Sequence, residues 1–370
     1  MHVLVTTDTV GGVWTYTREV VTGLVRRGCQ ITLVSFGEIP TAAQTEWMEG
    51  LPRLDFRPTA FRLEWMQDVE ADMEASSEFL RSVIQETGPD LLHFNQYYYG
   101  ALRSHLPRLV VAHSDVVGWW EAVHNQQPTE TKWLRWYRQA VSRGLAAASA
   151  VVAPSRWMLD SLTTNYVAPR ETFVIRNGRS PLLFNPHVSK EDYVLAVGRI
   201  WDSGKQVTLL AQQELPVPIW IIGSERHPDS ALRGESLTFG ASQPVIFKGP
   251  QSEAQLRQIY SRASIYAATS RYEPFGLAPV EAALSRCAIV ANDIPTFREL
   301  WEDAALFFDR NDSASLGRLL RSLIADRELR MHYANRAYNH ALQRFNTERV
   351  VDEYLALYRA LVSAPAGVAA

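Results

Sequence analysis

Short apolar runs rich in Val, Ile and Leu alternate with longer amphipathic stretches along the first half of the chain. The short runs have the length and β-branched composition of buried strands, and the longer stretches space their apolar residues with the period of a helix. This pattern predicts strands near residues 3–6, 31–35, 91–94, 110–113, 150–153 and 173–175, with helices at about residues 14–27, 68–87, 132–147 and 155–165.

The second half repeats this alternation. Strands that alternate with helices at this spacing form parallel sheets with the connecting helices on their faces. The sequence therefore predicts an α/β protein with two doubly wound, Rossmann-like domains. In this half the expected strands lie near residues 194–198, 219–222, 245–248, 265–268, 288–291 and 305–308, and the expected helices at about residues 206–213, 253–263, 279–285, 297–301 and 314–324.

A segment without clear periodicity separates the two halves. Residues 177–191 contain Gly178, Pro181 and Pro186, which interrupt regular structure, so we interpret them as an interdomain linker. Two further helices are expected at residues 327–344 and 347–361. The predicted organisation is an N-terminal domain at residues 1–180, a C-terminal domain at residues 181–345, and a last segment, residues 346–370, whose helix packs back on the N-terminal domain.

Composition agrees with this organisation and excludes several classes of protein. The chain has 370 residues, which is long for one core and suits two domains. Its 37 basic and 40 acidic side chains give a net charge of −3 without a basic run, so no nucleic-acid partner is expected. Cys29 and Cys287 lie too far apart in sequence to indicate a disulfide framework. Without a signal peptide or a membrane-spanning apolar window, the expected location is the cytoplasm, at most at the inner face of the membrane.

A glycine pair, Gly11 and Gly12, stands between the first predicted strand and the first predicted helix. Glycines at this position let backbone amides approach an anion closely, and the helix N-terminus adds partial positive charge. The dinucleotide fingerprint Gly-x-Gly-x-x-Gly is missing here. The alternative interpretation of the pair is a tight turn without a ligand.

Two cations, Arg199 and Lys205, follow the first predicted strand of the second domain. Ligands of doubly wound sheets bind at the carboxyl ends of the strands. There a guanidinium and an ammonium could hold the two phosphates of a diphosphate. The alternative is a pair of solvated loop cations.

The most informative motif places two glutamates eight positions apart, Glu273 in a loop and Glu281 in the helix that follows. Pro274 and Gly276 shape the loop, so that the amides at its end lie at the helix start and can face an anion or sugar hydroxyls. One carboxylate could then meet a sugar while the other meets a ribose diol. The alternative is a capped surface helix.

Taken together, these motifs resemble the retaining glycosyltransferases of family 4, which have the two-Rossmann-domain architecture called GT-B. The matching segments follow the order of that family and span nearly the whole chain. They are residues 11–12, 174–178, 197–205, 248–249, 273–281, 287–295 and 298–300. The resemblance implies two Rossmann-like domains that face a cleft, with acceptor binding in the first and donor binding in the second.

For the sugar and the ribose, the resemblance implies separate glutamates. Glu273 would contact hydroxyls of the transferred sugar, supported by the backbone of Phe275, Gly276 and Leu277. Glu281 would bind the ribose hydroxyls of the nucleotide.

For the diphosphate and the base, the resemblance implies four further contacts. Arg199 and Lys205 would stabilise the diphosphate, whose negative charge grows as the glycosidic bond breaks. Gly12, together with Gly11, would approach it from the N-terminal domain. Lys248 lies at the strand end where the family holds the base.

On the acceptor side, His113 matches the family histidine at a strand end of the first domain, beside the sugar and the acceptor. A histidine in this position can also be an ordinary hydrogen-bonded core residue. His93 and Asn95 follow another strand of the same domain and could line the same cleft. The aromatic residues that could stack on an acceptor are Tyr97, Trp119 and Trp120.

One helix of the first domain allows two interpretations. Within residues 132–143, aromatic and aliphatic side chains share one helical face and basic side chains lie mostly opposite. Such a helix could lie on a membrane surface. An aromatic stripe of this kind belongs more often to a core, and we favour the core.

The resemblance implies a retaining hexosyltransferase that takes its sugar from a nucleotide sugar. Family frequency favours UDP-glucose as the donor, followed by GDP-mannose, and the acceptor would be a small molecule, a glycan or a lipid-linked hydroxyl. No cofactor and no metal are expected, because the sequence has no Asp-x-Asp motif and supplies its own cations. Alternatives are a glycosyl phosphorylase on the same scaffold and a non-catalytic nucleotide-binding protein.

The chain departs from the family pattern at two places. Arg179 and Ser180 follow Asn177-Gly178, where the family often has an aspartate at the fourth position. Arg286 and Cys287 replace a small residue and a glycine.

Overall fold

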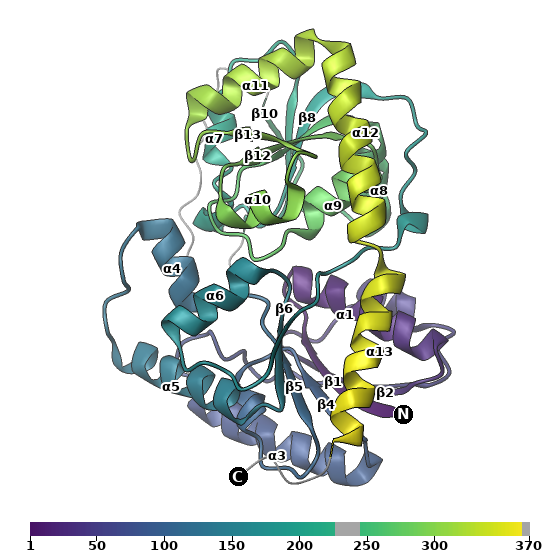
Figure 1. Ribbon diagram of the computed structural model, residues 1–370, viewed down its shortest axis with the longest axis vertical. Coiled ribbons are helices and arrows are strands. Elements are labelled where there is room, and N and C mark those ends of the chain that lie inside the picture. Colours follow the sequence, from purple (N-terminus) through teal and green to yellow (C-terminus); the bar gives the residue numbers. More distant parts are fainter. Residues whose placement is uncertain (226–244, 365–370) are drawn as a thin grey trace. The chain divides into compact units, whose positions relative to one another are not determined.

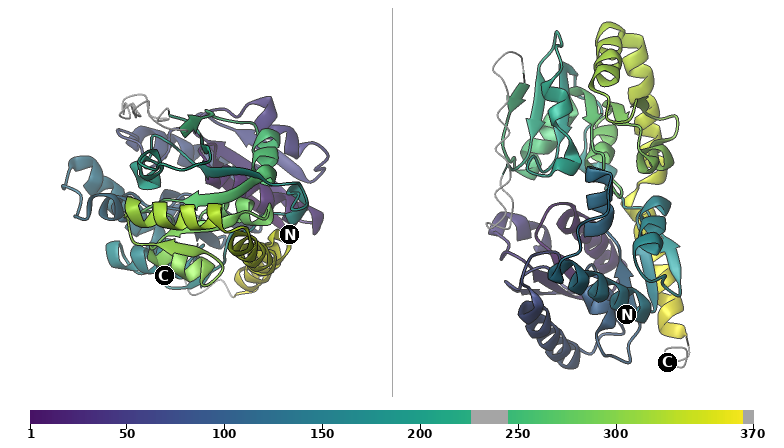
Figure 2. Two further views of the ribbon diagram at one scale, coloured as in Figure 1. Left: turned by 90° about the horizontal axis from the view of Figure 1, so that it is seen from above. Right: turned by 90° about the vertical axis from the view of Figure 1, so that its left-hand side faces the viewer.

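The computed structural model describes residues 1–225 and 245–364, which contain two parallel β-sheets with helices on their faces (Figures 1 and 2). Contacts divide the chain into two compact units. Unit 1 comprises Met1–Glu121, Gln126–Asn177 and Thr347–Ala370, and unit 2 comprises Ala122–Asn125 and Gly178–Asn346. The prediction of an α/β fold with two Rossmann-like sheets is confirmed.

The sheet of unit 1 has seven parallel strands. They are β1 (His2–Asp8), β2 (Gln30–Phe36), β3 (Leu54–Pro58), β4 (Leu91–Phe94), β5 (Arg108–Val111), β6 (Ala150–Ala153) and β7 (Thr172–Val174). Their spatial order is β3-β2-β1-β4-β5-β6-β7. Because β1 pairs with β2 on one side and with β4 on the other, the winding direction reverses at β1.

Helices and short 3-10 turns connect these strands. They are α1 (Gly12–Arg26), α2 (Ala42–Thr45), η1 (Glu46–Met48), α3 (Glu70–Thr87), η2 (Tyr98–Ala101), α4 (Val116–His124), α5 (Lys132–Ala147) and α6 (Arg156–Asn165). Side-chain caps fix, among others, where α5 and α6 begin. Thr131 accepts the Leu134 amide at the start of α5, and Ser155 accepts the Met158 amide at the start of α6, each at 3.1 Å.

The sheet of unit 2 repeats this winding with six parallel strands. They are β8 (Glu191–Val197), β9 (Ile219–Ile222), β10 (Val245–Phe247), β11 (Ala263–Ala268), β12 (Ala288–Asn292) and β13 (Leu306–Phe308). The spatial order is β10-β9-β8-β11-β12-β13, so β8 occupies the reversal point. The carboxyl ends of β8 and β11 therefore meet at one edge of the sheet.

The connections of unit 2 include the loops that carry its candidate residues. Its helices and turns are η3 (Pro181–Leu183), η4 (Ser203–Lys205), α7 (Thr208–Ala211), α8 (Glu253–Arg262), α9 (Leu277–Leu284), α10 (Pro295–Trp301), α11 (Ser313–Ala325) and α12 (Arg327–Arg344). Buried aliphatic and aromatic side chains fill both faces of the sheet.

One helix of unit 1 comes from far along the sequence. α13 (Thr347–Ser363) packs against α1 and is drawn in yellow in Figure 1. Val351 lies directly on Gly23, where a Cβ would overlap it, so the glycine permits this close approach. The Thr347 hydroxyl donates to the buried Glu19 carboxylate at 2.8 Å.

Several elements differ from the sequence pattern, among them three in or near the sheets and their long connections. The helix expected at residues 206–213 is shortened to α7, and the turn η4 precedes it, because Gln206 adopts a left-handed φ of 49° between them. The pattern misses β3, an edge strand whose residues are mostly half-buried and form no continuous apolar run. It also misses α4, which is so uniformly apolar that no helical period stands out.

Candidate functional site

In unit 2 the predicted diphosphate lysine and the predicted sugar glutamate touch. Lys205 follows β8 and Glu273 follows β11, and because these strands are neighbours the two side chains meet at the sheet edge. Lys205 Nζ lies 2.5 Å from Glu273 Oε2, and the Ser270 hydroxyl donates to the same oxygen at 3.2 Å. Both charged side chains keep some exposure, 18% and 14%. The ion pair is therefore open to exchange with a charged ligand.

Hydrogen bonds between the two loops fix this geometry. The Thr269 hydroxyl donates to the Lys205 carbonyl at 2.8 Å, and the Arg271 amide donates to the Gly204 carbonyl at 2.9 Å. From the next strand, the Asn292 amide group donates to the Ser270 carbonyl at 3.1 Å. The loop backbones are thus held by each other, independently of the ion pair.

Arg199, the second predicted cation, has a partner of its own. Its Nη2 donates to Asp202 Oδ2 at 2.7 Å, and its guanidinium carbon lies 5.1 Å from the ring centroid of Trp201. Asp202 also accepts the Gly204 amide at 2.9 Å. Arg199 remains 40% exposed, whereas Asp202 is almost fully buried. Sequence analysis missed Asp202, although its position three residues after the arginine was a signal for such a pair.

The loop between Glu273 and α9 depends on a glycine. Gly276 precedes the helix with φ of 92°, in the left-handed region that favours glycine, and a Cβ there would lie 3.2 Å from the Glu273 Cγ. Phe275 anchors the loop, since it is buried and packs edge-on against Phe345 at 5.3 Å. The backbone of Phe275, Gly276 and Leu277 consequently forms the entry to α9.

Glu281, the predicted ribose ligand, lies on α9 and forms an ion pair that the sequence pattern gave no reason to expect. Its Oε1 is 2.9 Å from the Nε of Arg179, a residue of the predicted linker. The Glu281 side chain is 14% exposed and that of Arg179 is 2% exposed.

Lys248 lies just after β10, where the resemblance implies the base. Its Nζ is 4.1 Å from the ring centroid of Trp220, and the Trp220 ring stacks on Tyr193 with a centroid distance of 4.1 Å. A cation over an aromatic face is a stabilising contact. It holds the ammonium against the sheet.

In unit 1 the glycine pair forms the start of α1. Gly11 has φ of 69° and Gly12 is the first residue of the helix, and both are exposed. Just before them, the Asp8 carboxylate accepts the Val10 amide at 2.9 Å and shapes the turn.

His113 belongs to a neutral polar network. Its Nε2 lies 2.8 Å from Asn95 Oδ1, and its ring packs edge-on against Tyr16 at 4.6 Å. Asn95 Nδ2 donates to the Thr6 carbonyl at 2.6 Å, so the amide oxygen faces the histidine, which must donate from Nε2. Burial, with a smaller contribution from His93, lowers the pKa of His113 to about 3. The ring is therefore neutral near pH 7, with Nδ1 as an acceptor.

The fold and this arrangement agree with two family matches. Residues 10–181 match Glycosyltransferase Family 4, and residues 184–340 match Glycosyl transferases group 1. This chain is a GT-B glycosyltransferase of family 4.

Individual relatives of this glycosyltransferase are distant. The alpha-maltose-1-phosphate synthase of Mycolicibacterium smegmatis is 24% identical over 335 residues, which are 80% of this chain and 85% of that protein. The lipopolysaccharide core biosynthesis mannosyltransferase LpcC of Rhizobium leguminosarum is 31% identical over 133 residues, 35% of this chain and 37% of that protein.

Solved structures show the same fold at low identity. A sucrose-phosphate synthase from Thermosynechococcus elongatus has a TM-score of 0.78 and 18% identity, covering 98% of this chain and 99% of that chain. Anabaena HepE, in complex with UDP and glucose, has a TM-score of 0.74 and 19% identity, covering 97% of this chain and 100% of that chain.

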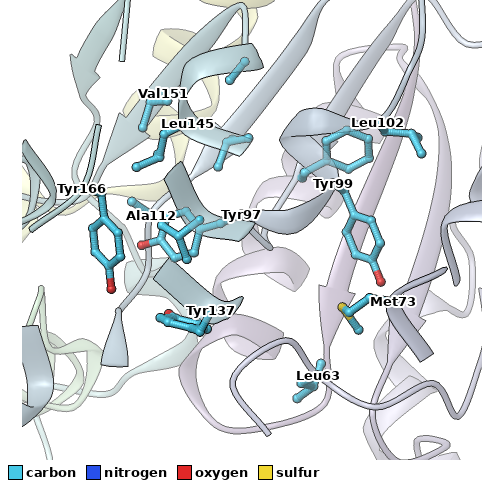
Figure 3. Close-up of a cluster of buried hydrophobic side chains, with 14 of the residues drawn as sticks. Leu63, Met73, Tyr97, Tyr99, Leu102, Ala112, Tyr137, Leu145, Val151 and Tyr166 are labelled. Carbon is cyan, nitrogen blue, oxygen red and sulfur yellow. The ribbon is translucent and has the colours of Figure 1, made fainter. Parts of the chain in front are cut away.

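Three residues that we expected to line the acceptor side of the glycosyltransferase are instead buried. His93 has no exposed surface, Tyr97 is 3% exposed and Asn95 is 8% exposed. Tyr97 lies within the hydrophobic cluster of unit 1 (Figure 3). His93 Nδ1 lies 2.5 Å from the Tyr358 hydroxyl of α13. Direct contact of His93 and Tyr97 with an acceptor is therefore a wrong prediction. Asn95 instead hydrogen-bonds to the His113 ring through its amide oxygen.

The predicted stacking pair, Trp119 and Trp120, lies on α4. Both side chains are half-buried, and their rings meet edge-on at 6.3 Å with an interplanar angle of 61°. Stacking of these rings on an acceptor stays a prediction.

The aromatic face of α5 is part of the core, as favoured. Leu134, Tyr137 and Val141 are buried, and Trp133 donates from its indole nitrogen to the Met66 carbonyl at 2.8 Å (Figure 3 shows Tyr137 in this cluster). This corrects the membrane-surface interpretation. In the described part of the chain, each helix is too short or too polar to cross a bilayer.

Proposed function

We propose that this glycosyltransferase is a retaining hexosyltransferase that uses a nucleotide-sugar donor, with UDP-glucose first and GDP-mannose second. The observation that carries the proposal is the contact between Lys205 and Glu273 at the joint end of β8 and β11. It places a cation suited to a diphosphate beside an acceptor suited to sugar hydroxyls. The names of relatives, a mannosyltransferase and an alpha-maltose-1-phosphate synthase, and the UDP and glucose bound to HepE support a hexose donor.

The proposed reaction breaks the bond between the anomeric carbon and the diphosphate oxygen, which keeps the electron pair. Lys205 and Arg199 would leave Glu273 and Asp202 and stabilise the negative charge that develops on the diphosphate. Glu273, released from the lysine, would accept hydrogen bonds from sugar hydroxyls. The acceptor oxygen attacks from the side the diphosphate leaves, and its proton passes to the departing phosphate oxygen. The configuration of the anomeric carbon is then retained.

His113 would contribute without carrying charge. Its Nε2 proton is engaged by Asn95, so only Nδ1 is available to accept a hydrogen bond from a hydroxyl of the sugar or the acceptor. Unit 1 would thus bind the acceptor, and unit 2 the donor. We expect the acceptor hydroxyl to belong to a small molecule, a glycan or a lipid-linked sugar, and the protein to work in the cytoplasm.

Metal independence is part of the proposal, because the sequence has no Asp-x-Asp motif and two protein cations can take the role of a metal. Turnover should survive an excess of EDTA with little loss. A strict requirement for Mn²⁺ or Mg²⁺ would mean that a metal ion, and not the two protein cations, stabilises the diphosphate.

The decisive experiment begins with thermal-shift titrations of UDP, GDP and ADP. The base that stabilises the protein then defines the donors for an NMR assay that follows the anomeric proton of the product. An α-linked product from an α-linked donor supports the proposal. A requirement for inorganic phosphate would indicate a glycosyl phosphorylase, and binding without turnover of any donor would indicate a nucleotide-binding protein.

A further inference from the structure

Arg179 is the most deeply buried cation near the candidate site. It lies directly after Gly178, where the chain enters unit 2, and it is 1% exposed. Its amide donates to the Phe345 carbonyl at 2.9 Å, and its backbone forms a parallel bridge with Asn346, where the chain leaves the unit. The backbone of Arg179, where the chain enters unit 2, is thus held by residues 345 and 346, where the chain leaves it. Burial of a guanidinium is costly unless carboxylates compensate the charge.

The Arg179 guanidinium joins two carboxylates that come from different helices. Its Nε is 2.9 Å from Glu281 Oε1 on α9, and its Nη2 donates to Glu253 Oε1 at the start of α8 at 3.0 Å. The guanidinium carbon also lies 5.4 Å from the ring centroid of Phe184. The Nη2 contact is a hydrogen bond and the Nε contact is an ion pair, so one guanidinium compensates the charge of both carboxylates.

The contact with Arg179 matters for Glu281, because Glu281 is the predicted ribose ligand. Its side chain is 14% exposed, and the buried Tyr260 lies close enough that the Glu281 charge helps to raise the pKa of the phenol. A cation beside a partly buried carboxylate favours its charged form and helps to fix its orientation. An ionised carboxylate offers about four acceptor positions, so it can hold Arg179 and still accept both hydroxyls of a cis-diol.

We propose that Arg179 is a positioning residue for nucleotide binding, which orients the Glu281 carboxylate to receive the ribose diol of the donor. The inference rests on the proposed function, since it takes Glu281 as the ribose ligand. Arg179 itself does not touch the nucleotide. Glu253 holds the other side of the guanidinium and contributes to its placement only.

The test is calorimetric titration of UDP and of 2′,3′-dideoxy-UDP, which lacks the diol, into wild type, Arg179→Met and Arg179→Lys. If the thermal-shift screen selects another base, the nucleoside diphosphate of that base and its 2′,3′-dideoxy analogue are used. For Arg179→Met, the Kd of UDP should rise about tenfold or more, as expected for a charged hydrogen bond. The Kd of the dideoxy nucleotide should stay within about twofold of wild type, because neither protein can use the diol. Arg179→Lys should show a smaller loss with the same dependence on the diol.

Matched variants separate positioning from general stability. Glu253→Gln removes the other carboxylate but leaves the Arg179–Glu281 contact, so its UDP affinity should stay within about twofold of wild type. In Arg179→Met/Glu281→Gln, UDP should bind no more weakly than in Glu281→Gln alone, because the arginine acts through the glutamate. Donor KM should rise while kcat stays within about threefold in Arg179→Lys, which remains the decisive variant if Arg179→Met does not fold.

Two results would overturn the inference. One is an equal loss of affinity for UDP and the dideoxy nucleotide, which would make Arg179 a general structural residue. The other is unchanged UDP affinity in folded Arg179→Met or, where that variant does not fold, in Arg179→Lys. By contrast, wild type that binds no nucleoside diphosphate would contradict the proposed function itself.

Discussion

At the sheet edge of unit 2, Lys205 and Glu273 form an ion pair that keeps 14–18% of each side chain exposed, and Arg199 pairs with Asp202. In unit 1, the residue that the family resemblance selects is His113, which is bound to Asn95 and backed by buried aromatic rings. Both units share the same strand winding up to the sixth strand, so β8 and β11 correspond to β1 and β4, and His113 follows β5, the strand beside β4.

The two units differ in the chemistry of the side chains that follow their strands. Unit 2 offers charges that are already neutralised by partners and that a ligand of higher charge can take over. Unit 1 offers neutral groups whose orientation is fixed by burial and by hydrogen bonds. We therefore expect substitutions in unit 2 to act on ligand binding and turnover, and substitutions in the unit 1 network to act first on stability.

The largest expected effect is that of Glu273→Gln. Its carboxylate contacts the sugar in the proposed mechanism, and hydrogen bonds to the sugar strengthen as the ring flattens, so kcat should fall about 100-fold, or about 2.7 kcal/mol. Lys205 loses its competing partner in this variant, so UDP should bind at least as tightly as to wild type. Steady-state kinetics and calorimetry with UDP measure both values. A loss of UDP affinity at unchanged kcat would reverse the roles of Glu273 and Glu281.

Next in size is the loss of either cation. Lys205→Ala should weaken UDP binding by about 1.5–3 kcal/mol, and Arg199→Ala by the lower end of that range, because Arg199 is more exposed and better screened. Calorimetry at low and high salt checks both the size and the screening. His113→Asn is the matched control from unit 1, and it should leave UDP affinity unchanged. Equal losses of UDP affinity in all three variants would contradict the expected difference between unit 1 and unit 2.

An intermediate effect concerns pH. The pKa of His93 is about 4 and that of His113 about 3 in the folded protein, because burial disfavours their charged forms, whereas both titrate near 6.5 in the unfolded chain. Between these values only the unfolded state takes up protons, so the free energy of unfolding falls as the pH decreases. From about pH 7.5 to about pH 5.5, each histidine should remove about 1.4 kcal/mol.

Urea denaturation of wild type and His93→Asn at both pH values isolates this contribution. The variant should lose about 1.4 kcal/mol less than wild type on acidification. The comparison is needed because burial raises the pKa of Glu64 to about 7, and its protonation in the folded state works in the opposite direction over the same range. An identical pH dependence for both proteins would mean that folding does not lower the pKa of His93.

The smallest expected effect is that of Tyr358→Phe. The hydroxyl is 2.5 Å from His93 Nδ1, and its removal leaves a buried acceptor without that partner, which costs about 1 kcal/mol of unfolding free energy. Urea denaturation near neutral pH measures it. UDP affinity should not change, since the network lies in unit 1. A loss of UDP affinity would show that the His93 network of unit 1 is coupled to nucleotide binding in unit 2.

The sequence predicted the strand and helix alternation well because parallel strands are buried on both faces and stand out as apolar runs. It also predicted that Glu273 and Lys205 belong together, since both follow strands of one sheet and the family motif contains them. Their direct contact follows from the adjacency of β8 and β11, which no local pattern specifies.

Other features depend on contacts between distant segments. Arg179 has the local signature of a linker residue, and its burial is set by Phe345 and Glu281, more than 100 positions away. His93 was expected near the acceptor because it ends a strand, yet α13 covers it through Tyr358, 265 positions further along. Periodicity and local motifs contain no information about such pairs.

The return of α13 to unit 1 also governs the order in which this enzyme can fold during translation. Its helical segment leaves the ribosome only after all of residues 178–346 have been made. At about 5–20 residues per second, this takes roughly 8 to 35 s. During that interval the nascent unit 1 lacks the helix that packs on α1 at Gly23 and contacts His93 through Tyr358. Unit 2 can thus fold first, and chaperones that shield apolar surface have their natural target in the half of the enzyme that was synthesised earlier.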